Sequence, residues 1–307
     1  MKDLIIIGAG PAGLAAAIYG LRAGLNLAVL EKFSPGGQVI NTWEVENYPG
    51  FAEPVSGVAL MAAMEAQARR LGADITGGEV EQVEKTGDFF SLKMSDGPAL
   101  ETKAVIAATG ASLRKLGVPG EKDFTGRGVS YCATCDAAFF RNKTVAVVGG
   151  GDTALEEAIF LTRFAEKIYL MHRRDRFRGS KILQERILSS NKVEPLYDTV
   201  VESINGSAVV ESARVKNKVS GKVSDITLQG IFIFIGFDPN AGYLPRTVLN
   251  GKGEASVDMR MRTPIPGLFA AGDIRSDSRR QIVTACADGA TAAMESYDYI
   301  ESSVKIT

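Results

Sequence analysis

Two cysteines separated by two residues form the most reactive pattern in the chain. Cys132 and Cys135 lie in the stretch SYCATCDAAFF, residues 130–140, and Asp136 directly follows the second cysteine. Such a pair can supply half of a zinc site, form a fixed structural disulfide, or form a disulfide that opens and closes during a reaction. The carboxyl of Asp136 could act as an acid and base in thiol chemistry, or it could cap a helix at the cysteine loop.

The supply of further metal ligands argues against zinc. A structural zinc ion needs four tetrahedral ligands, and the chain holds only three cysteines and one histidine, His172. The third cysteine, Cys286, lies far from the pair and has no potential partner near it in sequence. We therefore predict no metal site. We interpret Cys286 as a small buried residue, with a third redox thiol as the alternative.

Composition indicates a globular protein with room for two domains. The chain has 307 residues, of which 45% are hydrophobic, and 35 basic residues balance 36 acidic ones. This charge balance gives no electrostatic basis for binding nucleic acid or an anionic membrane. Residues 4–21 carry no charge and resemble a signal peptide, but Gly8, Gly10, Pro11 and Gly13 interrupt them. We predict no targeting or membrane segment and a cytoplasmic protein.

The N-terminal stretch DLIIIGAGPAGLAAAIYGLRAGLNLAVLEK is typical of a dinucleotide site. A short apolar run ends before Gly8, and Gly10 and Gly13 complete a GxGxxG pattern that opens a helical stretch. Glycines at these positions permit a tight turn, close approach of the backbone to a pyrophosphate, and close packing of helix on strand. Glu31 ends the next apolar run, where a carboxylate would accept hydrogen bonds from a ribose. These surroundings favour a nucleotide site over a flexible loop.

The same pattern recurs in TVAVVGGGDTALEEAIFLTRFAEKIYLMHRRDRFR. Gly149, Gly151 and Ala154 follow an apolar run, and the spacing that leads from Gly8 to Glu31 leads here from Gly149 to His172. In place of an acid stands the segment HRRDRFR, with arginines at positions 173, 174 and 178. Guanidinium groups would bind the 2′-phosphate of NADPH, and two charge-assisted hydrogen bonds at roughly 1.5–3 kcal/mol each would favour NADPH over NADH by ~10²- to 10⁴-fold. The alternative is a solvated basic patch.

Turn-rich segments of alternating polarity follow each glycine motif. The first is EVEQVEKTGDFFSLKMSDG, and a similar alternation at residues 225–230 precedes IFIFIGFDPN. We interpret both as β-meanders that lead back to a last strand of a parallel sheet. The predicted fold class is therefore α/β, with two Rossmann-like, doubly wound, three-layer nucleotide-binding domains.

The whole chain resembles low-molecular-weight thioredoxin reductases of the bacterial and archaeal type. The resemblance rests on both glycine motifs, the CATCD segment, GGQ at residues 36–38, EVENYPGF at residues 44–51, and the ending TPIPGLFAAGDIRSDSRRQIVTACADGATAAMESYDYI. It implies that the NADPH-binding domain is inserted into the FAD-binding domain. We expect the FAD domain at 1–114 and 245–307, and the NADPH domain, which carries the cysteine pair, at 115–244. The two crossings are expected near residues 113–119 and 237–244.

Motif and resemblance together assign the cofactor contacts. For FAD we expect contacts from Gly8, Gly10, Pro11, Ala12, Gly13, Glu31, Gly37, Gln38, Asn47, Thr109, Gly272, Asp273, Arg280 and Gln281. For NADPH we expect contacts from Gly149, Gly151, Asp152, Thr153, Ala154, His172, Arg173, Arg174 and Arg178.

The resemblance also implies a reaction. Electrons would pass from NADPH to FAD, then to the Cys132–Cys135 disulfide, and finally to an oxidised thioredoxin, with rotation of the NADPH domain between steps. Cys135 would be the sulfur nearer the flavin. Relatives of glutathione reductase use a C-terminal histidine as acid and base, and this chain has none there, so Asp136 takes that role. A homodimer is expected by resemblance.

One departure and several rivals accompany this prediction. Most family members have glycine where this chain has Ala137; if that position needs a positive φ, alanine would cost on the order of 1 kcal/mol. The closest rival is a related flavoprotein disulfide reductase that serves another thioredoxin-like or peroxiredoxin partner. Ferredoxin–NADP reductases of similar fold lack the cysteine pair. A redox sensor that binds nucleotides without turnover is a rival from a different class.

Overall fold

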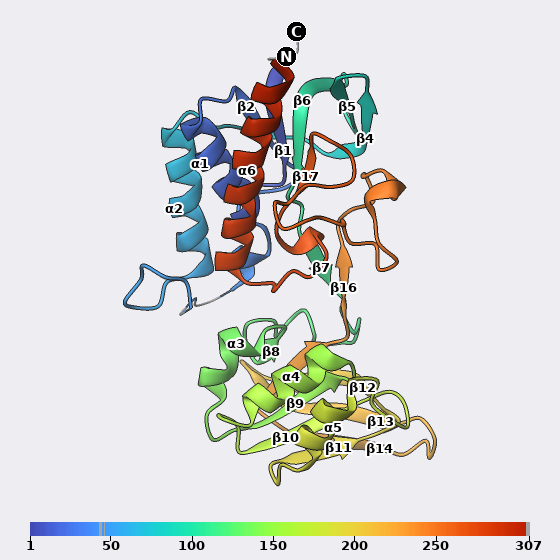
Figure 1. The fold of residues 1–307 in the computed structure, drawn as a ribbon. Coiled ribbons are helices and arrows are strands. Elements are labelled where there is room, and N and C mark those ends of the chain that lie inside the picture. Colours follow the sequence, from blue (N-terminus) through green and yellow to red (C-terminus); the bar gives the residue numbers. More distant parts are fainter. Residues whose placement is uncertain (43–44, 46, 305–307) are drawn as a thin grey trace. The chain divides into compact units, whose positions relative to one another are not determined.

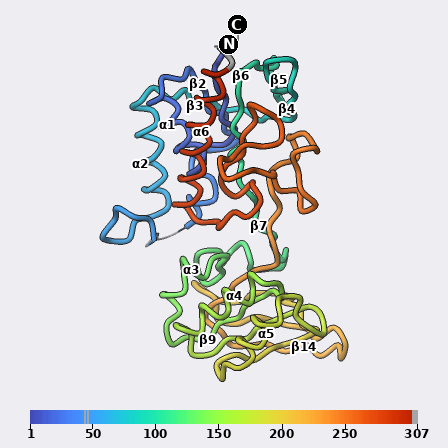
Figure 2. The backbone as a smooth tube through the Cα atoms, in the orientation of Figure 1, coloured from blue at the N-terminus to red at the C-terminus, as the bar shows by residue number. Residues whose placement is uncertain are grey.

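The computed structural model describes residues 1–42, 45 and 47–304. The chain divides into two compact units: Met1–Ser112 with Asp238–Thr307, and Leu113–Phe237. The second unit is thus inserted into the first, and Figure 2 shows the green and yellow middle of the chain forming it. The first boundary between the units follows Ser112, two residues before the boundary expected from sequence. The second boundary follows Phe237, whereas the sequence predicted it after Leu244.

The first unit is built on a seven-stranded sheet of order β3-β2-β1-β6-β5-β4, with β17 paired to β6. Pairing is parallel from β3 through β6 and to β17, and antiparallel among β4, β5 and β6. The antiparallel hairpin confirms the meander expected after the first glycine motif. The strands are β1 (Lys2–Ile7), β2 (Leu27–Glu31), β3 (Asp74–Gly77), β4 (Val80–Thr86), β5 (Phe89–Met94), β6 (Leu100–Ala107) and β17 (Leu268–Ala270).

Apolar layers cover both faces of this sheet because its central strand is apolar on both sides. Leu4 and Ile6 pack among the helices, and Ile5 and Ile7 pack on the opposite face. Figure 1 shows the helices α1 (Pro11–Arg22), α2 (Gly57–Arg70) and α6 (Ile282–Val304) side by side on one face of the sheet. The short helices of the unit are η1 (Gly37–Asn41), η3 (Arg246–Val248) and η4 (Gly272–Ile274).

The second unit repeats the parallel core on a smaller scale. Its sheet has the order β11-β10-β9-β15-β8, and every pair in it is parallel. One face packs on the helices of the unit, and the other packs on an antiparallel sheet of order β12-β13-β14. The strands are β8 (Val129–Ser130), β9 (Thr144–Gly149), β10 (Lys167–Met171), β11 (Val193–Leu196), β12 (Thr199–Gly206), β13 (Val210–Asn217), β14 (Val223–Thr227) and β15 (Gly230–Phe234). The helices are α3 (Ala133–Asp136), η2 (Ala137–Phe140), α4 (Asp152–Leu161) and α5 (Lys181–Leu188).

Both units therefore share one topology, which confirms the predicted α/β fold class. In each unit a central strand (β1 or β9) leads through a glycine turn into a helix (α1 or α4) and then to the neighbouring strand (β2 or β10). The sheet order reverses beside that central strand, where nucleotides bind in folds of this kind. The chain crosses between the units in two short strands, β7 (Ala111–Leu113) and β16 (Phe237–Pro239), which pair with each other.

Candidate active site

The first glycine turn uses its glycines for different reasons. Gly8 has φ +105°, and a Cβ atom there would lie 2.5 Å from the carbonyl oxygen of Ala108. A Cβ on Gly13 would lie 1.8 Å from the carbonyl oxygen of Gly8, because α1 packs directly on the strand end. Gly10 has no such neighbour within 3.9 Å, and Pro11 follows it at the start of α1. Gly8 and Gly13 are thus required by the fold, whereas Gly10 leaves the helix N-terminus open to a ligand.

Two other predicted segments lie beside this open helix end. A Cβ atom built on Gly37 would lie 3.4 Å from the Cα of Gly10. A Cβ atom built on Gly272 would lie 3.0 Å from the methyl of Ala12. Gln38 follows Gly37 in η1 and is exposed. The structure therefore brings the GGQ segment, the GxGxxG turn and the Gly272–Asp273 turn together at the N-terminus of α1.

Glu31 lies at the end of β2 and faces the same turn. The backbone N–H of Ala9 donates to its Oε2 (2.7 Å), and that of Phe33 donates to its Oε1 (3.0 Å). The carboxylate is half-buried, so both oxygens keep lone pairs that ribose hydroxyls could use.

Two further predicted residues, Asn47 and Thr109, contact segments distant in sequence. The side-chain amide of Asn47 donates to Oε1 of Gln281 (3.2 Å), which joins two segments distant in sequence. The hydroxyl of Thr109 donates to the carbonyl oxygen of Asn240 (2.8 Å). Of the EVENYPGF stretch, Glu44 and Glu46 lie outside the described residues.

Asp273 and Arg280 are both held in place by neighbours. The hydroxyl of Ser278 donates to Oδ1 of Asp273 (2.8 Å), and burial raises the pKa of this carboxyl. A guanidinium nitrogen of Arg280 lies 3.7 Å from Glu254, and its backbone has φ +55°. A left-handed conformation is costly for a residue other than glycine, so tertiary contacts must fix the Arg280 turn.

The second glycine turn, between β9 and α4, is closed in the same way. A Cβ on Gly149 would lie 2.4 Å from the carbonyl oxygen of Phe234 and 2.5 Å from the methyl of Ala154. Gly151 caps α4 and has no neighbour within 4 Å of its Cβ position. Asp152 begins the helix and accepts a hydrogen bond from the backbone of Ser180 (2.7 Å), while Thr153 is exposed.

His172 lies beneath this turn rather than on the surface. Its Nδ1 would be 2.3 Å from a Cβ on Gly150, so only glycine fits above the ring. The side chain is 5% exposed, and its buried Nε2 has no hydrogen-bond partner within the described part of the chain. Burial, followed by the charges of Arg178, Arg174 and Arg173, lowers the pKa of the imidazole, so the ring is neutral near pH 7.

The three predicted arginines themselves are exposed at the end of β10. Arg173 and Arg174 directly follow His172, and the backbone N–H of Arg178 donates to the carbonyl oxygen of Gly150 (2.6 Å). This bond ties the arginine segment to the glycine turn. The exposed cations therefore surround the mouth of the turn, where a 2′-phosphate would lie.

Cys132 and Cys135 form a closed disulfide with an S–S distance of 2.09 Å. Cys132 precedes the one-turn helix α3, Cys135 lies within it, and both cysteines are half-buried. Asp136 follows Cys135 directly in sequence, and the hydroxyl of Ser130 donates to its Oδ2 (2.5 Å), which fixes the position of the carboxyl. Burial raises the pKa of Asp136, although the Ser130 hydrogen bond opposes this effect. A carboxyl of this kind stays protonated to higher pH than an exposed aspartate and can exchange protons with a thiol.

Ala137 occupies an ordinary helical conformation. Its backbone has φ −57° and ψ −33°, and the residue is 2% exposed within an apolar cluster. No positive φ is required here, so alanine is accepted without backbone strain.

Cys286 is a free thiol of the first unit, whereas the disulfide belongs to the second. It is partly buried in α6, its sulfur contacts the hydroxyl of Tyr48 (3.7 Å), and burial raises the pKa of the thiol. These surroundings are those of a packing residue rather than a reactive thiol.

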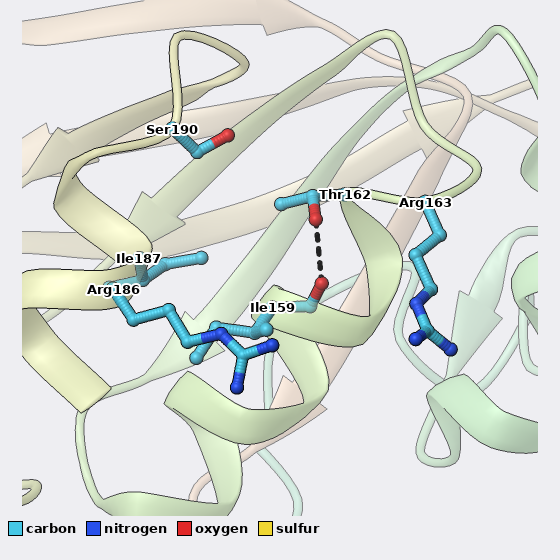
Figure 3. Close-up of a pocket in the computed structure, with 6 residues that line it drawn as sticks. All are labelled: Ile159, Thr162, Arg163, Arg186, Ile187 and Ser190. Carbon is cyan, nitrogen blue, oxygen red and sulfur yellow. Dashed lines mark hydrogen bonds between the residues drawn. The ribbon is translucent and has the colours of Figure 1, made fainter. Parts of the chain in front are cut away.

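A pocket between α4 and α5 contains none of the predicted site residues. Figure 3 shows its lining, and its volume is about 140 Å³. It lies at the C-terminal ends of both helices, where the negative end of the helix dipole favours cations such as the nearby arginines and disfavours a bound phosphate. Its lining residues are Ile159, Thr162, Arg163, Arg186, Ile187 and Ser190.

Within the described residues, no helix is long and apolar enough to cross a membrane. In the same part of the chain, no group of three or more His, Cys, Asp or Glu side chains is arranged to hold a metal ion.

The pyridine nucleotide-disulphide oxidoreductase family matches residues 2–289. The chain belongs to this family. Oxidoreductases of the family use a pyridine nucleotide, which fits the two glycine turns and the closed disulfide.

Named relatives within the family are thioredoxin reductases. The thioredoxin reductase of Peptoclostridium litorale is 46% identical over 306 residues and covers 97% of both chains. The crystal structure of thioredoxin reductase from Streptococcus pyogenes MGAS5005 is 44% identical, has a TM-score of 0.92 and covers 98% of this chain and 99% of that one. The Lactococcus lactis enzyme in its FR conformation is 42% identical but has a TM-score of 0.67, at 98% and 100% coverage.

Two residues that organise the site, Asp288 and Glu157, escaped the sequence interpretation. Asp288 accepts hydrogen bonds from Arg275 (2.7 and 2.9 Å) and from the backbone of Gly272 (3.2 Å), so it fixes the turn at Asp273. Its only sequence signal is an acid within a helix of small residues, where a buried carboxylate needs a partner. Glu157 gives no such signal in the sequence, because its hydrogen bond with the backbone of Ala133 joins two different helices.

Proposed function

We propose that this protein is an NADPH-dependent thioredoxin-disulfide reductase that passes electrons to the Cys132–Cys135 disulfide and from there to oxidised thioredoxin. The observation that carries this proposal is the closed CxxC disulfide with a buried carboxyl behind it, in a chain with two nucleotide-type glycine turns. When bound, FAD and NADPH supply hydride and electron transfer that no side chain of the protein can perform.

The first unit fits FAD. The open end of α1 at Gly10 can receive a pyrophosphate on backbone N–H groups, and Glu31 can accept hydrogen bonds from a ribose. Gly37, Gln38 and the Gly272–Asp273 turn lie beside the same helix end and would complete the cradle. Asn47, Thr109, Arg280 and Gln281 would hold the rest of the cofactor. We therefore assign the first unit, Met1–Ser112 with Asp238–Thr307, as the FAD domain.

The second unit fits NADPH. Gly149, Gly151 and Ala154 form the turn, with Asp152 and Thr153 at the start of α4, and the exposed Arg173, Arg174 and Arg178 can bind a 2′-phosphate. His172 would act by packing under the turn and offering its buried Nε2, because its ring is neutral. We assign the inserted unit, Leu113–Phe237, to this domain.

The residues around the disulfide have separate tasks in this scheme. Opening the disulfide takes two electrons and two protons to give two thiols, and one thiol of the pair must then attack the disulfide of the partner as a thiolate. Asp136 lies directly behind Cys135 and can hold the proton that this cycle moves, because burial favours its protonated form. Ser130 keeps that carboxyl in place.

We further propose that the nucleotide-binding unit rotates about the β7 and β16 segments during turnover. The disulfide and the nicotinamide would both belong to the inserted unit, so each must reach one flavin in turn. Related thioredoxin reductases of nearly equal identity match this chain with TM-scores of 0.92 and 0.67, as expected if relatives differ in the arrangement of their units. A cross-link that fixes the two units should stop turnover, and undiminished activity would refute the rotation.

The test of the function is an anaerobic mixing experiment that follows flavin absorbance. Bleaching by NADPH, followed by recovery on addition of oxidised thioredoxin, is the expected result. The Cys132→Ser variant is the matched control: it should bleach normally but not recover with thioredoxin, because its disulfide is missing.

The other outcomes of that experiment point to different functions. Bleaching without recovery in the wild type would keep the flavoprotein but assign another disulfide partner, such as a peroxiredoxin. No bleaching by NADPH, with a response to NADH or reduced ferredoxin, would refute the role of the arginines.

Similarity to the family also supports a homodimer and a cytoplasmic location. Sedimentation of the purified flavoprotein would measure the oligomeric state, and a mass of one chain would refute the dimer.

A further inference from the structure

Glu157 connects the nucleotide-binding helix α4 to the loop that carries the disulfide. The backbone N–H of Ala133 donates to its Oε2 (3.0 Å), and that of Thr134 also donates to the carboxylate. These are the two residues between Cys132 and Cys135. One carboxylate therefore accepts hydrogen bonds from both amides inside the CxxC loop.

The position of Glu157 differs from that of its neighbour Glu156. Glu156 is exposed on the same helix, whereas Glu157 is half-buried against the disulfide loop. Burial raises the pKa of Glu157, and the two backbone hydrogen bonds oppose this and favour its ionised form. A half-buried carboxylate is screened less than a surface one, so its charge acts strongly on groups nearby.

The helices packed most closely on α3 carry charges of one sign. These helices are α4 and η2, and neither they nor α3 itself contains a lysine or arginine. They contain Asp136 behind the pair, Asp152 bonded to the backbone of Ser180, and Glu156 on the exposed face. No cation of these elements offsets the charge of Glu157.

We propose that Glu157 is a positioning residue that keeps the Cys132–Cys135 dithiol strongly reducing by withholding the loop amides and adding a negative charge beneath the pair. Reduction of the disulfide takes up two electrons and, where one thiol ionises, one net proton, to give a thiol and a thiolate. Backbone N–H groups that follow a cysteine normally stabilise its thiolate. Here the amides are occupied and a carboxylate lies behind them, so the thiolate is less stable and electrons leave the pair more readily. This inference rests on the proposed function, in which the pair must reduce a thioredoxin at roughly −270 mV.

The test is the equilibrium of the pair in buffers of reduced and oxidised dithiothreitol, using the flavin-containing protein. After acid quench and alkylation, mass spectrometry of the peptide that contains both cysteines gives the reduced fraction, so Cys286 does not contribute. Glu157→Gln keeps a neutral acceptor for the amides but removes the charge. We expect its equilibrium constant to shift about tenfold toward the dithiol, which equals a potential about 30 mV less negative. The pKa of the attacking thiol, from the pH dependence of alkylation, should fall as well.

Glu156→Gln is the matched control, since it removes the same charge from the adjacent exposed position. If Glu157 only braces the loop, both glutamine variants will match wild type in equilibrium constant and thiol pKa, and that result overturns the proposal. If Glu157→Gln does not fold, Glu157→Asp decides the question. Its shorter side chain keeps the charge but loses reach, so a smaller shift in the same direction is expected, and no shift overturns the proposal.

The readout uses neither NADPH nor thioredoxin. A protein that fails to reduce thioredoxin could therefore still show the shift, and a true thioredoxin reductase could fail to show it. The two results separate failure of this inference from failure of the proposed function.

Discussion

Gly13 and Gly10 belong to one sequence motif, yet the structure predicts different effects when each is changed to alanine. In Gly13→Ala the new methyl would lie 1.8 Å from the carbonyl oxygen of Gly8 and 2.9 Å from its carbonyl carbon. Both atoms are backbone, so α1 and the end of β1 must move apart. In Gly10→Ala the nearest atom lies 3.9 Å away, and φ of −76° suits alanine.

The magnitudes decide the sign of the first change. Alanine gains at most about 1 kcal/mol over glycine from helix propensity. Overpacking a close contact costs about 1–3 kcal/mol, and here the contact must open by roughly 1 Å against backbone rather than a flexible side chain. We expect Gly13→Ala to destabilise the flavin-free protein by about 1–2 kcal/mol, which lowers its Tm by about 2–8 °C. Gly10→Ala should change it by only a few tenths of a kcal/mol.

Flavin binding should reverse the order of the two variants. The methyl of Gly10→Ala points into the space where a pyrophosphate would meet the helix, so we expect FAD affinity to fall at least about tenfold, or about 1.4 kcal/mol. Thermal unfolding of the flavin-free protein and quenching of flavin fluorescence on titration measure the two effects separately. Equal Tm values for wild type and Gly13→Ala would refute the packing argument, and unchanged FAD affinity in Gly10→Ala would refute the open cradle.

Four further predictions concern the second unit. Asp136→Asn should slow electron transfer into the disulfide by ~10²- to 10⁴-fold, because the carboxyl that holds the proton is gone. The rate in stopped-flow traces should also lose its pH dependence, and a pH dependence like that of wild type would contradict this role. His172 is the only histidine, and burial lowers its pKa in the folded protein, so the unfolded chain binds the proton at higher pH. The free energy of unfolding should therefore be constant above about pH 6.5 and fall below it. Urea unfolding of His172→Gln should lack this loss. Replacing Arg173 and Arg174 by glutamine should lower the preference for NADPH over NADH by ~10²-fold or more in kcat/KM, and an unchanged ratio would mean that these cations are only solvated. Ala137→Gly should destabilise the protein by about 1 kcal/mol in chemical unfolding, because the backbone there is helical; a stabilised variant would indicate strain at this position.

The features that the sequence predicted well are those with local causes. The glycine turns depend on strand, turn and helix within one short segment, so their spacing alone located both central strands and both helices. The same holds for the meander at β4 and β5 and for the disulfide, whose cysteines are separated by one helical turn. The residues that define each of these elements therefore lie within one short segment of the sequence.

The return from the inserted unit shows where local signals end. The sequence marked the crossing by its Gly and Pro residues and extended the second domain to Leu244. In the structure Ala241 and Leu244 are already buried in the apolar cluster that contains Ile5 and Phe90. That cluster joins residues more than 150 positions apart, so only tertiary packing determines which side of the boundary they occupy.

His172 and Glu157 show the same limit within the site itself. Spacing placed His172 correctly at the end of β10, but it could not show that the ring lies under Gly150, where its role is to fill space and present one buried nitrogen. Glu157 had no motif at all, because its acceptor role exists only once α4 packs against α3. His172 contacts the nucleotide turn at Gly150, and Glu157 contacts the cysteine loop at Ala133. A motif search finds the atoms that touch substrate or cofactor, whereas the residues that set the charge and shape around those atoms emerge only when separate helices and strands are packed together.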